Sequence, residues 1–385
     1  MRKPTAVIDL DVTQPLTFPD GLDRYTEAAV LWRVRQRPLG LVRAPVVHGR
    51  VVLEHAIREL LEKLTAPCGV ALAERAIASG RPPCWPDAGV LRESWMPPLT
   101  SGPTISLVIG TTGRGANLQR CLDAVRAIGY QSIDPVVIEH ASTGDVAVRR
   151  RAIRQSTADI VAFIDDDMEV DRHWVSSIVR AFLADPEVMV VTGPVIPREV
   201  ATPSRLFDDF PASDGFRRRW SRGRIDQTAS PAGNIAFWRS AFDAPDVVTW
   251  VNEPSAIVRG ARGHNGDVSP RGSARGASEA IRRVDLADAV RPVADAMGFD
   301  QLKLAVSWGA APLGRISIDH QGAVVSTAWI TDVIAQDLTV AVLDAQTRLG
   351  EHVLWATVTS TLGRALLPAV EASRREGRRR WSQAA

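Results

Sequence analysis

The chain has 385 residues, of which 45% are hydrophobic and 23% charged, with 46 basic against 44 acidic side chains. This length favours two or three domains with buried cores, and the net charge of +2 argues against a nucleic-acid-binding protein. Three cysteines without a CxxC pair exclude a disulfide scaffold and a cysteine-rich zinc site. Because no apolar run approaches a membrane span and the first residues do not form a secretory signal, we expect a cytoplasmic protein without a transmembrane segment.

The two ends of the chain carry similar patterns. In residues 1–66, strand patterns flank Pro38-Leu39-Gly40 and precede an amphipathic helix, and residues 279–345 repeat this order around Pro312-Leu313-Gly314. Each unit is too small to bury much apolar surface alone. We therefore expect two small α+β accessory modules, duplicated copies that pack together. Chance similarity of two hairpins is the alternative, since Pro-Leu-Gly turns are common.

Two segments have the composition of linkers. Residues 67–103 are rich in proline, and residues 261–278 are rich in Gly, Arg and Ser. Residues 346–385 predict a C-terminal helix followed by a basic tail. That tail is expected to be solvated, and contact with an anionic membrane surface is the lesser alternative.

Residues 104–260 form a central domain in which strand and helix patterns alternate. Short apolar runs predict strands at residues 105–109, 135–138, 160–164 and 188–191, and helical periodicity follows the first of them. This alternation predicts an α/β domain with a mostly parallel sheet. Ligands of such sheets bind along the carboxyl ends of the strands.

The strongest chemical signal is the run Asp165-Asp166-Asp167 directly after the third predicted strand. Adjacent carboxylates repel one another, and a fold tolerates them most readily where a cation offsets their charge. At a sheet edge, one or two of them can coordinate a hard divalent ion that also holds a diphosphate. The alternative is a solvated acidic turn.

Two further strand ends suit a nucleotide. The loop Gly110–Gly115 follows the first strand, and its glycines would let backbone N–H groups approach a phosphate or a base. Its spacing is GxxGxG rather than GxGxxG, so an NAD(P)-dependent oxidoreductase is a weaker alternative that also leaves the acidic run unexplained. Glu139 ends the second strand, where it would accept hydrogen bonds from a ribose or base or simply be exposed.

The central domain resembles family 2 glycosyltransferases of the GT-A fold, a Rossmann-like α/β architecture with a mixed, mostly parallel sheet. The matching segments follow one another in the family's order: Ile109–Arg114, Val137–Thr143, Ile160–Asp167, Thr192-Gly193-Pro194 and Ala232–Arg239. The terminal modules look similar to extensions of some actinobacterial members. The resemblance implies metal-dependent, inverting transfer of a sugar from a UDP- or GDP-type donor to an acceptor hydroxyl.

The resemblance also assigns roles to residues. It implies that Asp165 approaches the ribose and that Asp167, with Asp165, binds Mg²⁺ or Mn²⁺ at the donor diphosphate. It places Gly233 and Asn234 along the donor-sugar and acceptor side. The residues implied beside the nucleotide are Thr111, Arg114, Glu139 and Arg149.

One departure from the family concerns the general base, which takes the proton of the acceptor hydroxyl. Family members supply it from a Glu-Asp pair after the Gly-Asn-x-Ala-Phe-x-Arg segment, and no such pair lies between Phe242 and Glu253. Asp243, Asp246 and Glu253 are the candidate substitutes. The alternative function is therefore a catalytically impaired GT-A-like protein that binds nucleotide or serves as a scaffold.

Two other features are candidate parts of the site. His264 stands near the place of a third metal ligand in related enzymes, although an exposed histidine is the simpler interpretation. Arg217, Arg218, Arg219 and Arg222 would meet an anionic donor or acceptor, or else be solvated.

Overall fold

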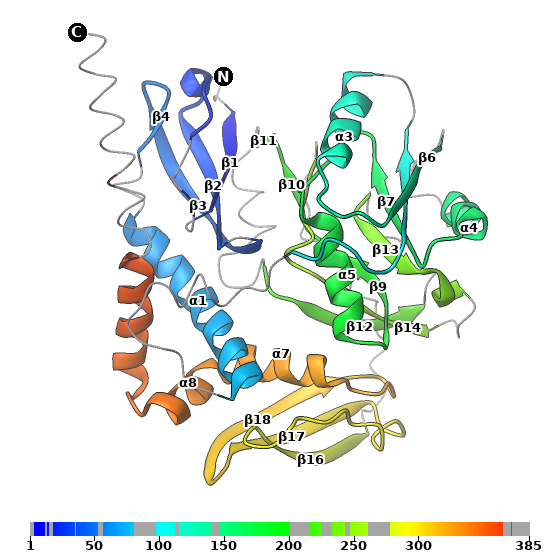
Figure 1. Ribbon diagram of the computed structural model, residues 1–385. Helices are drawn as coiled ribbons and strands as arrows, with labels where there is room; N and C mark the ends of the chain where they lie inside the picture. The colour runs from blue at the N-terminus through cyan, green and yellow to red at the C-terminus, as the bar shows by residue number, and fades with distance from the viewer. Residues whose placement is uncertain are drawn as a thin grey trace.

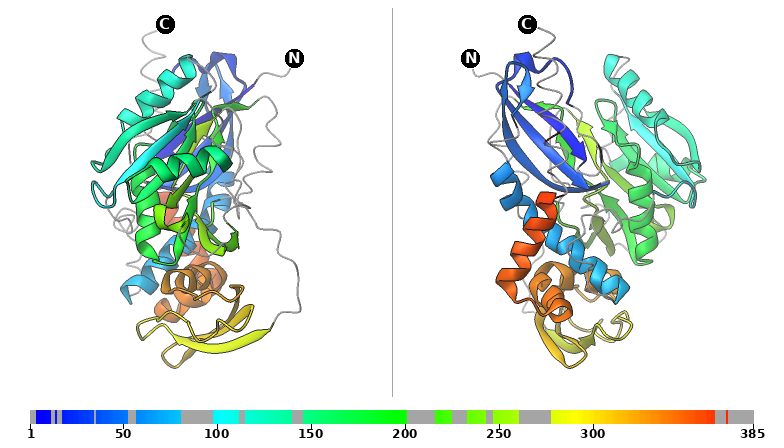
Figure 2. Two further views of the ribbon diagram at one scale, coloured as in Figure 1. Left: turned by 90° about the vertical axis from the view of Figure 1, so that its right-hand side faces the viewer. Right: turned by 60° about the vertical axis from the view of Figure 1, so that its left-hand side comes forward.

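The computed structural model describes residues 4–11, 14, 18–34, 36–52, 57–80, 98–111, 115–139, 146–200, 216–224, 233–242, 247–260, 278–364 and 371. The central residues form one sheet-based domain, and the two ends of the chain meet beside it (Figure 1). Figure 2 shows the N-terminal sheet against the central domain and the C-terminal sheet at the far end of the connecting helices.

The N-terminal module is a mixed sheet followed by a long helix. Strand β1 (Thr5–Asp11) runs parallel to β2 (Glu27–Val34), and β2 pairs antiparallel with β3 (Arg37–Val47). The short strand β4 (Arg50–Val51) continues the sheet beyond β3, and η1 (Leu22–Arg24) is a single 3₁₀ turn. On the other edge, β11 (Glu199–Val200) of the central domain pairs with β1, so the sheet joins two parts of the chain.

Helix α1 (Ile57–Ser79) corrects the predicted linker boundary. Residues 67–79 are helical although Pro67 lies inside the helix. Leu64, Cys68, Leu72 and Ala76 recur at four-residue spacing and are all buried, and this apolar stripe outweighs the local cost of one proline. Residues 81–97 of the predicted linker, and residues 261–277 of the second one, lie outside the described residues.

The C-terminal module has the same strand pairing as the N-terminal one. Strand β16 (Glu279–Asp285) is parallel to β17 (Gln301–Trp308), which pairs antiparallel with β18 (Ala311–Asp319). Irregular register occurs at Trp32/Arg33 and at Val306/Ser307, at equivalent places in the two sheets. Helices α7 (Thr327–Asp337) and α8 (Thr339–Thr347) follow, and residues 351–364 are also helical.

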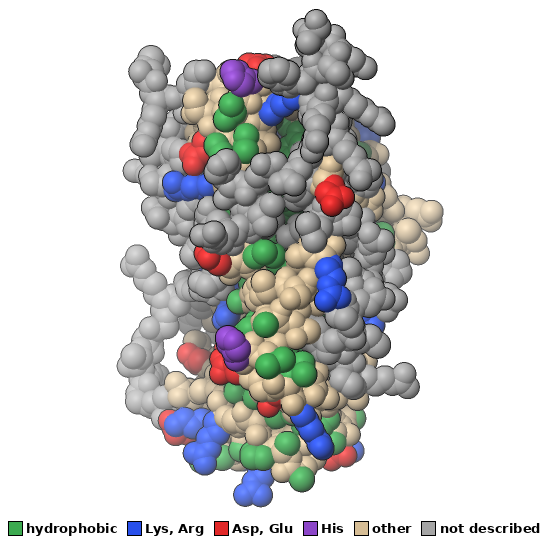
Figure 3. Space-filling view, turned by 90° about the vertical axis from the view of Figure 1, so that its left-hand side faces the viewer, with side chains coloured by type: hydrophobic (Ala, Val, Ile, Leu, Met, Phe, Trp, Pro, Cys, Tyr) green, Lys and Arg blue, Asp and Glu red, His purple; other side chains and the backbone are tan. Residues whose placement is uncertain are grey.

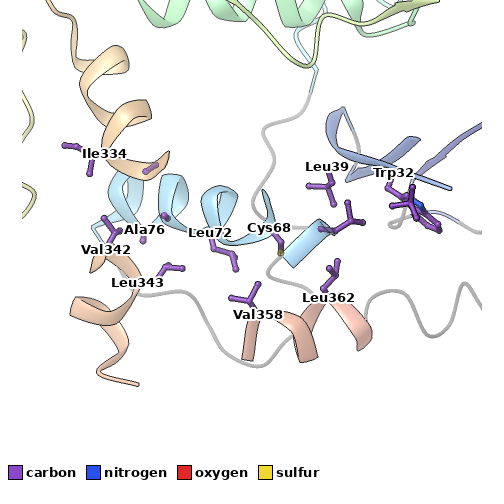
Figure 4. Packing of buried hydrophobic residues seen from close by; sticks show 14 of the residues in the cluster. Trp32, Leu39, Cys68, Leu72, Ala76, Ile334, Val342, Leu343, Val358 and Leu362 are labelled. Atoms are coloured by element: carbon purple, nitrogen blue, oxygen red, sulfur yellow. The ribbon is translucent and has the colours of Figure 1, made fainter. Parts of the chain in front are cut away.

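The two terminal modules share one hydrophobic core. It contains residues of β1–β3 and α1 together with residues of β16–β18, α7, α8 and the last helix. Figure 4 shows Cys68, Leu72 and Ala76 of α1 directed toward Leu343 and Val358. The first and last parts of the sequence therefore fold into a single unit, called the terminal body below.

Figure 3 views the terminal body from the side away from the central domain. Over its described residues, acidic and basic side chains are interspersed, and the hydrophobic ones do not merge into one large patch. Among the described helices, none combines the length and the apolar character that crossing a membrane requires.

The central domain is built on a seven-stranded sheet of order β12-β14-β9-β13-β7-β5-β6. Three of its six pairings are parallel and three antiparallel, so the sheet is mixed, as predicted, and five of its seven strands run in one direction. The four predicted strands all run in one direction, and the strands that oppose them, β12 and β13, were not predicted. The strand bounds are β5 (Ile105–Gly110), β6 (Ile133–Glu139), β7 (Ile160–Asp165), β9 (Val188–Thr192), β12 (Arg219–Arg224), β13 (Ile235–Trp238) and β14 (Val247–Asn252).

Helices cover both faces of this sheet. Helices α3 (Ala116–Arg126) and α5 (Trp174–Ala184) pack on one face, and α4 (Val146–Gln155) packs on the other. The turn η3 (Arg239–Phe242) follows β13. A small sheet of β8 (Glu169–Val170), β10 (Val195–Pro197) and β15 (Val258–Gly260), in the order β10-β15-β8, lies beside the main one.

The shared core predicts that a cavity in α1 destabilises the protein. Leu72 is fully buried, so we expect Leu72→Ala to lower the free energy of unfolding by about 2–5 kcal/mol. Leu183→Ala is the matched control because Leu183 is 57% exposed. Urea denaturation compares the two, and equal losses would contradict a core at Leu72.

Candidate functional site

Most of the predicted site residues that the structure describes meet at one edge of the seven-stranded sheet. Gly110 at the end of β5 pairs with both Glu139 and Asp165, the last residues of β6 and β7. Strand β13 runs the opposite way and starts at this edge, where Ile235 pairs with Phe163. Thr111, Glu139, the acidic run and Gly233-Asn234 therefore lie along the same edge, called the carboxyl edge below.

Several predicted residues cannot be placed to the same detail. For Glu139 and Arg149, only the backbone is described, at the end of β6 and within α4. Arg114, Asp243, Asp246 and His264 lie outside the described residues.

The acidic run Asp165–Asp167, called the acid triplet below, is tied to the first loop. The Asp166 N–H donates to the Gly110 carbonyl at 2.9 Å, and the buried Thr111 hydroxyl donates to Asp166 Oδ2 at 2.6 Å. The Met168 N–H donates to the Asp165 carbonyl at 3.1 Å, which closes a turn. The three carboxylates are half-buried, so the triplet has a fixed backbone and partial access to solvent.

Gly233 lies directly against the acid triplet. Its φ of +70° suits glycine, and a Cβ at this position would stand 2.8 Å from the Asp165 nitrogen and 2.9 Å from Asp165 Oδ2. Any side chain here would push the Asp165 carboxylate away. The glycine of the Gly-Asn pair therefore permits the close approach of β13 to the end of β7.

Asn234 is a support within the domain rather than part of the site lining. The residue is buried, its two amide hydrogens bond the Pro194 and Ala256 carbonyls at 3.2 and 2.7 Å, and its oxygen accepts from Trp174 Nε1 at 2.8 Å. Because both N–H donors are used inside the protein, the structure corrects the prediction that Asn234 lines the donor and acceptor side.

Basic residues surround the far end of the acid triplet. Arg198 Nη2 donates to the Asp167 carbonyl at 2.6 Å, and its Nε lies 2.9 Å from Glu169 Oε1. Arg120 of α3 approaches the same Glu169 oxygen at 3.4 Å. Behind the triplet, burial and the neighbouring carboxylates of Asp166 and Asp167 raise the pKa of Cys121 to about 12.

Glu253 reaches the carboxyl edge but is engaged on both of its oxygens. It follows β14, where its N–H donates to the Thr192 carbonyl at 2.8 Å, and it is buried. Oε2 accepts from Arg218 Nε and Nη2, both at 2.8 Å, and Oε1 accepts from the Ser255 N–H at 3.0 Å. A role for Glu253 as general base would require this arrangement to open.

Arg218 connects Glu253 with the terminal body. Its Nη1 lies 3.0 Å from Oδ1 of Asp332 on α7, and Trp220 Nε1 donates to Asp332 Oδ2 at 2.9 Å. Burial opposes the charge of Arg218, but Asp332, Glu253 and Glu74 together raise its pKa well above the ordinary value. Burial, with the nearby charge of Glu74, raises the pKa of Asp332 even though Arg218 acts the other way. Arg218 is therefore an internal cation of this contact.

The described residues on either side of Asp243 and Asp246, the other two base candidates, lie at the opposite edge of the sheet. Strand β13 leaves the carboxyl edge, so Phe242 of η3 and Val247 at the start of β14 stand at the opposite edge of the sheet. Asp243 and Asp246 fall between these two residues. The chain therefore enters and leaves that stretch on the side away from the acid triplet.

The donor chemistry of the triplet fits Mg²⁺ or Mn²⁺, which prefer carboxylate oxygens. Within the described ranges, no group of three or more His, Cys, Asp or Glu side chains is arranged around a common metal position. One or two carboxylates would therefore hold such a cation, with further oxygens coming from a bound diphosphate.

Comparison with known proteins relates the central domain to one family. Residues 136–244 match the profile of the family described as glycosyl transferase family 2. Over this stretch the domain is similar to the family 2 glycosyltransferases. The matched stretch of the central domain contains the acid triplet and Gly233-Asn234, so the predicted resemblance to this family is confirmed here.

Two individual relatives are informative about the extent of the similarity. A glucosyl-dolichyl phosphate glucuronosyltransferase of Haloferax volcanii is 28% identical over 142 residues, which are 36% of this chain and 44% of that relative. The chain thus matches less than half of the relative's length. Mannosyltransferase PcManGT from Pyrobaculum calidifontis, solved with GDP-Man and Mn²⁺, overlaps 50% of this chain and 68% of its own at 16% identity, with a TM-score of 0.28. A superposition this loose says nothing about individual residues.

The contact between Gly233 and Asp165 predicts that Gly233→Ala perturbs the site. The added methyl group meets the Asp165 backbone at a positive φ, so we expect a loss of about 1–3 kcal/mol of stability in urea denaturation. Gly298→Ala is the matched control because a Cβ there meets nothing within 4 Å. If both variants unfold alike, the close approach is wrong.

The buried thiols give a second prediction. Burial raises the pKa of both Cys68 and Cys121 to about 12, so at pH 8 they are thiols rather than reactive thiolates. We expect iodoacetamide to leave both unmodified in the native protein and to modify both in urea, as measured by peptide mass spectrometry. Rapid native labelling of Cys121 would contradict its position behind the triplet.

Proposed function

We propose that the protein is a metal-dependent nucleotide-sugar glycosyltransferase that transfers a sugar, with inversion, from a UDP- or GDP-type donor to an acceptor hydroxyl. The observation that carries this is the acid triplet, held at the carboxyl edge by Gly233 and Thr111 within the stretch that matches the family. Within the triplet, Asp166 accepts a hydrogen bond from the neutral Thr111 hydroxyl, which fixes its carboxylate without neutralising its charge.

The residues around the triplet account for donor binding. Asp167 and Asp165 would hold the divalent cation, which when bound offsets the negative charge that develops on the leaving diphosphate. Thr111 fixes Asp166 and so sets the direction of its neighbours. Thr111, Arg114, Glu139 and Arg149 are proposed to face the nucleotide, and Gly233 leaves room beside Asp165.

The second candidate function is a nucleotide-binding protein with impaired transfer. The observation that favours it concerns the general base. Glu253 is the one base candidate described at the carboxyl edge, and Arg218 and the Ser255 N–H engage both of its oxygens. Asp243 and Asp246 lie in a stretch whose described flanks stand at the opposite edge. Nucleotide binding is supported independently of this question.

The terminal modules are proposed to be copies of one unit. Their support is the identical order of parallel and antiparallel pairings and the register shift at equivalent positions. Over the described residues, the two modules differ in their surroundings, because the N-terminal one joins its sheet to the central domain through β11.

The proposal predicts that nucleotide affinity depends on Asp167 and on a divalent cation. We expect UDP or GDP to bind in millimolar Mn²⁺ and at least about 10-fold more weakly in EDTA or in Asp167→Asn, because the diphosphate charge is no longer offset. Calorimetric titration measures both. Asp337→Asn is the matched control, since Asp337 is exposed on α7.

Two results separate the candidate functions. If UDP or GDP binds equally well in EDTA, the carboxylates do not hold a cation at the diphosphate. Neither candidate function could then depend on a metal. Binding without any donor hydrolysis or transfer would leave the second candidate in place of the first.

A further inference from the structure

The N-terminal sheet lies directly beside the strand that follows the acid triplet. Strand β8 begins two residues after Asp167 and leads into Asp171, and its antiparallel partner β15 places Arg259 opposite Glu169. Asp171 and Arg259 both make ion pairs with the N-terminal module. Any displacement of that module would therefore be passed to the segment immediately after the triplet.

Four charged residues form the contact, called the charge clamp below. Arg33 of β2 lies 3.1 Å from Asp171 Oδ2 and 2.5 Å from Asp9 Oδ2, and Arg259 approaches the same Asp9 oxygen at 3.2 Å. Two guanidinium groups thus face two carboxylates. The clamp spans β1 and β2 on one side and β8 and β15 on the other.

The burial of Arg33 requires that its carboxylate partners stay in place. The Arg33 side chain is only 6% exposed, whereas those of Asp9, Asp171 and Arg259 are about one-quarter exposed. A buried guanidinium is tolerated only while its carboxylate partners stay in place. Asp171 Oδ1 also accepts from the His173 N–H at 2.8 Å, so this residue is fixed from the side of α5 as well.

A second route connects the same module to Asp167 itself. Arg198, whose guanidinium holds the Asp167 carbonyl, directly precedes β11, and β11 pairs with Thr5 and Ala6 of β1. Apolar side chains seal the contact: Ala29, Leu31 and Leu41 of the N-terminal sheet cluster with Ile196 and Ile257 of the transferase domain.

The C-terminal module offers a comparison within the chain. Asp9 is the fifth residue of β1, and Arg283 holds the fifth place in β16 of the equivalent sheet. Arg283 is exposed, and Ile281, which corresponds to Val7, is 69% exposed. The equivalent face of the second sheet is thus free of this contact over the described residues, so the clamp is specific to the first module.

We propose that Arg33 and Asp9 are positioning residues for the acid triplet, so that the N-terminal module sets the affinity of the transferase site for a divalent cation with its nucleoside diphosphate. The inference rests on the proposed function. It adds that a module outside the family match controls the site without touching the ligand.

The test measures Mn²⁺ binding to the full chain with and without UDP or GDP. Electron paramagnetic resonance reports the free Mn²⁺, and calorimetry gives the affinity. We expect Arg33→Met to weaken Mn²⁺–nucleotide binding at least 10-fold, and Arg33→Lys, which keeps the charge, to restore part of it. Arg283→Met is the matched control and should bind as the wild type does.

Stability is separated from positioning by two further variants. Leu72→Ala lowers the stability of the terminal body without touching the clamp, so it should bind Mn²⁺–nucleotide normally at a temperature where it is folded. Asp9→Asn, at a partly exposed position, replaces Arg33→Met if that variant does not fold, with the same expected weakening.

Failure of the positioning role can be distinguished from failure of the proposed function. If the wild type binds Mn²⁺–nucleotide and the folded clamp variants bind it equally well, the positioning role is overturned and the functional proposal stands. If Leu72→Ala weakens binding as much as the clamp variants do, general stability explains the effect and the positioning role is again overturned. If the wild type itself shows no such binding, the functional proposal fails first.

Discussion

The common direction of β5, β6 and β7 is the constraint on which the site depends. Parallel strands end on the same side of a sheet, so loops far apart in sequence meet there. The opposed strand β13 adds Gly233 to the same edge, and the missing side chain of Gly233 lets the Asp165 backbone and carboxylate sit close to it. Thr111 and Arg198 then hold the segment from either end. Carboxylates that would repel one another are thereby kept at short range.

The strands β5, β6, β7 and β9 and the acid triplet can be predicted from local sequence, because buried strands are short apolar runs that end in polar residues. The order of strands in the sheet cannot be predicted in this way. Strand β13 is only four residues long, and its place between β7 and β9 depends on contacts with distant strands. The prediction that a linker begins at Pro67 was wrong, because the apolar stripe that α1 buries against α7 and α8 outweighs the local effect of this proline. The clamp between Arg33 and Asp171 joins residues 138 positions apart, and neither residue stood out in the sequence.

The carboxyl edge is thus assembled from three parts of the chain. The central domain supplies the acid triplet, the N-terminal module holds the segment behind it, and α7 of the C-terminal module engages Arg218 and, through it, Glu253. Two of these contacts use a cation between two carboxylates. Removing one partner of such a buried ion pair strongly destabilises the fold, because it leaves a charge unpaired. These contacts therefore fix the relative position of the parts more than they add to stability.

The shared core of the terminal body has a consequence for how the polypeptide is made. Its first half, including α1, leaves the ribosome more than 200 residues before α7 and α8 supply the apolar surface against which α1 packs. During that interval α1 is covered by β3 but not by α7 and α8, while the inserted central domain is free to fold. A chain cut short before residue 279 would therefore leave apolar surface of α1 exposed and become a substrate for chaperones or proteases, even with its central domain complete.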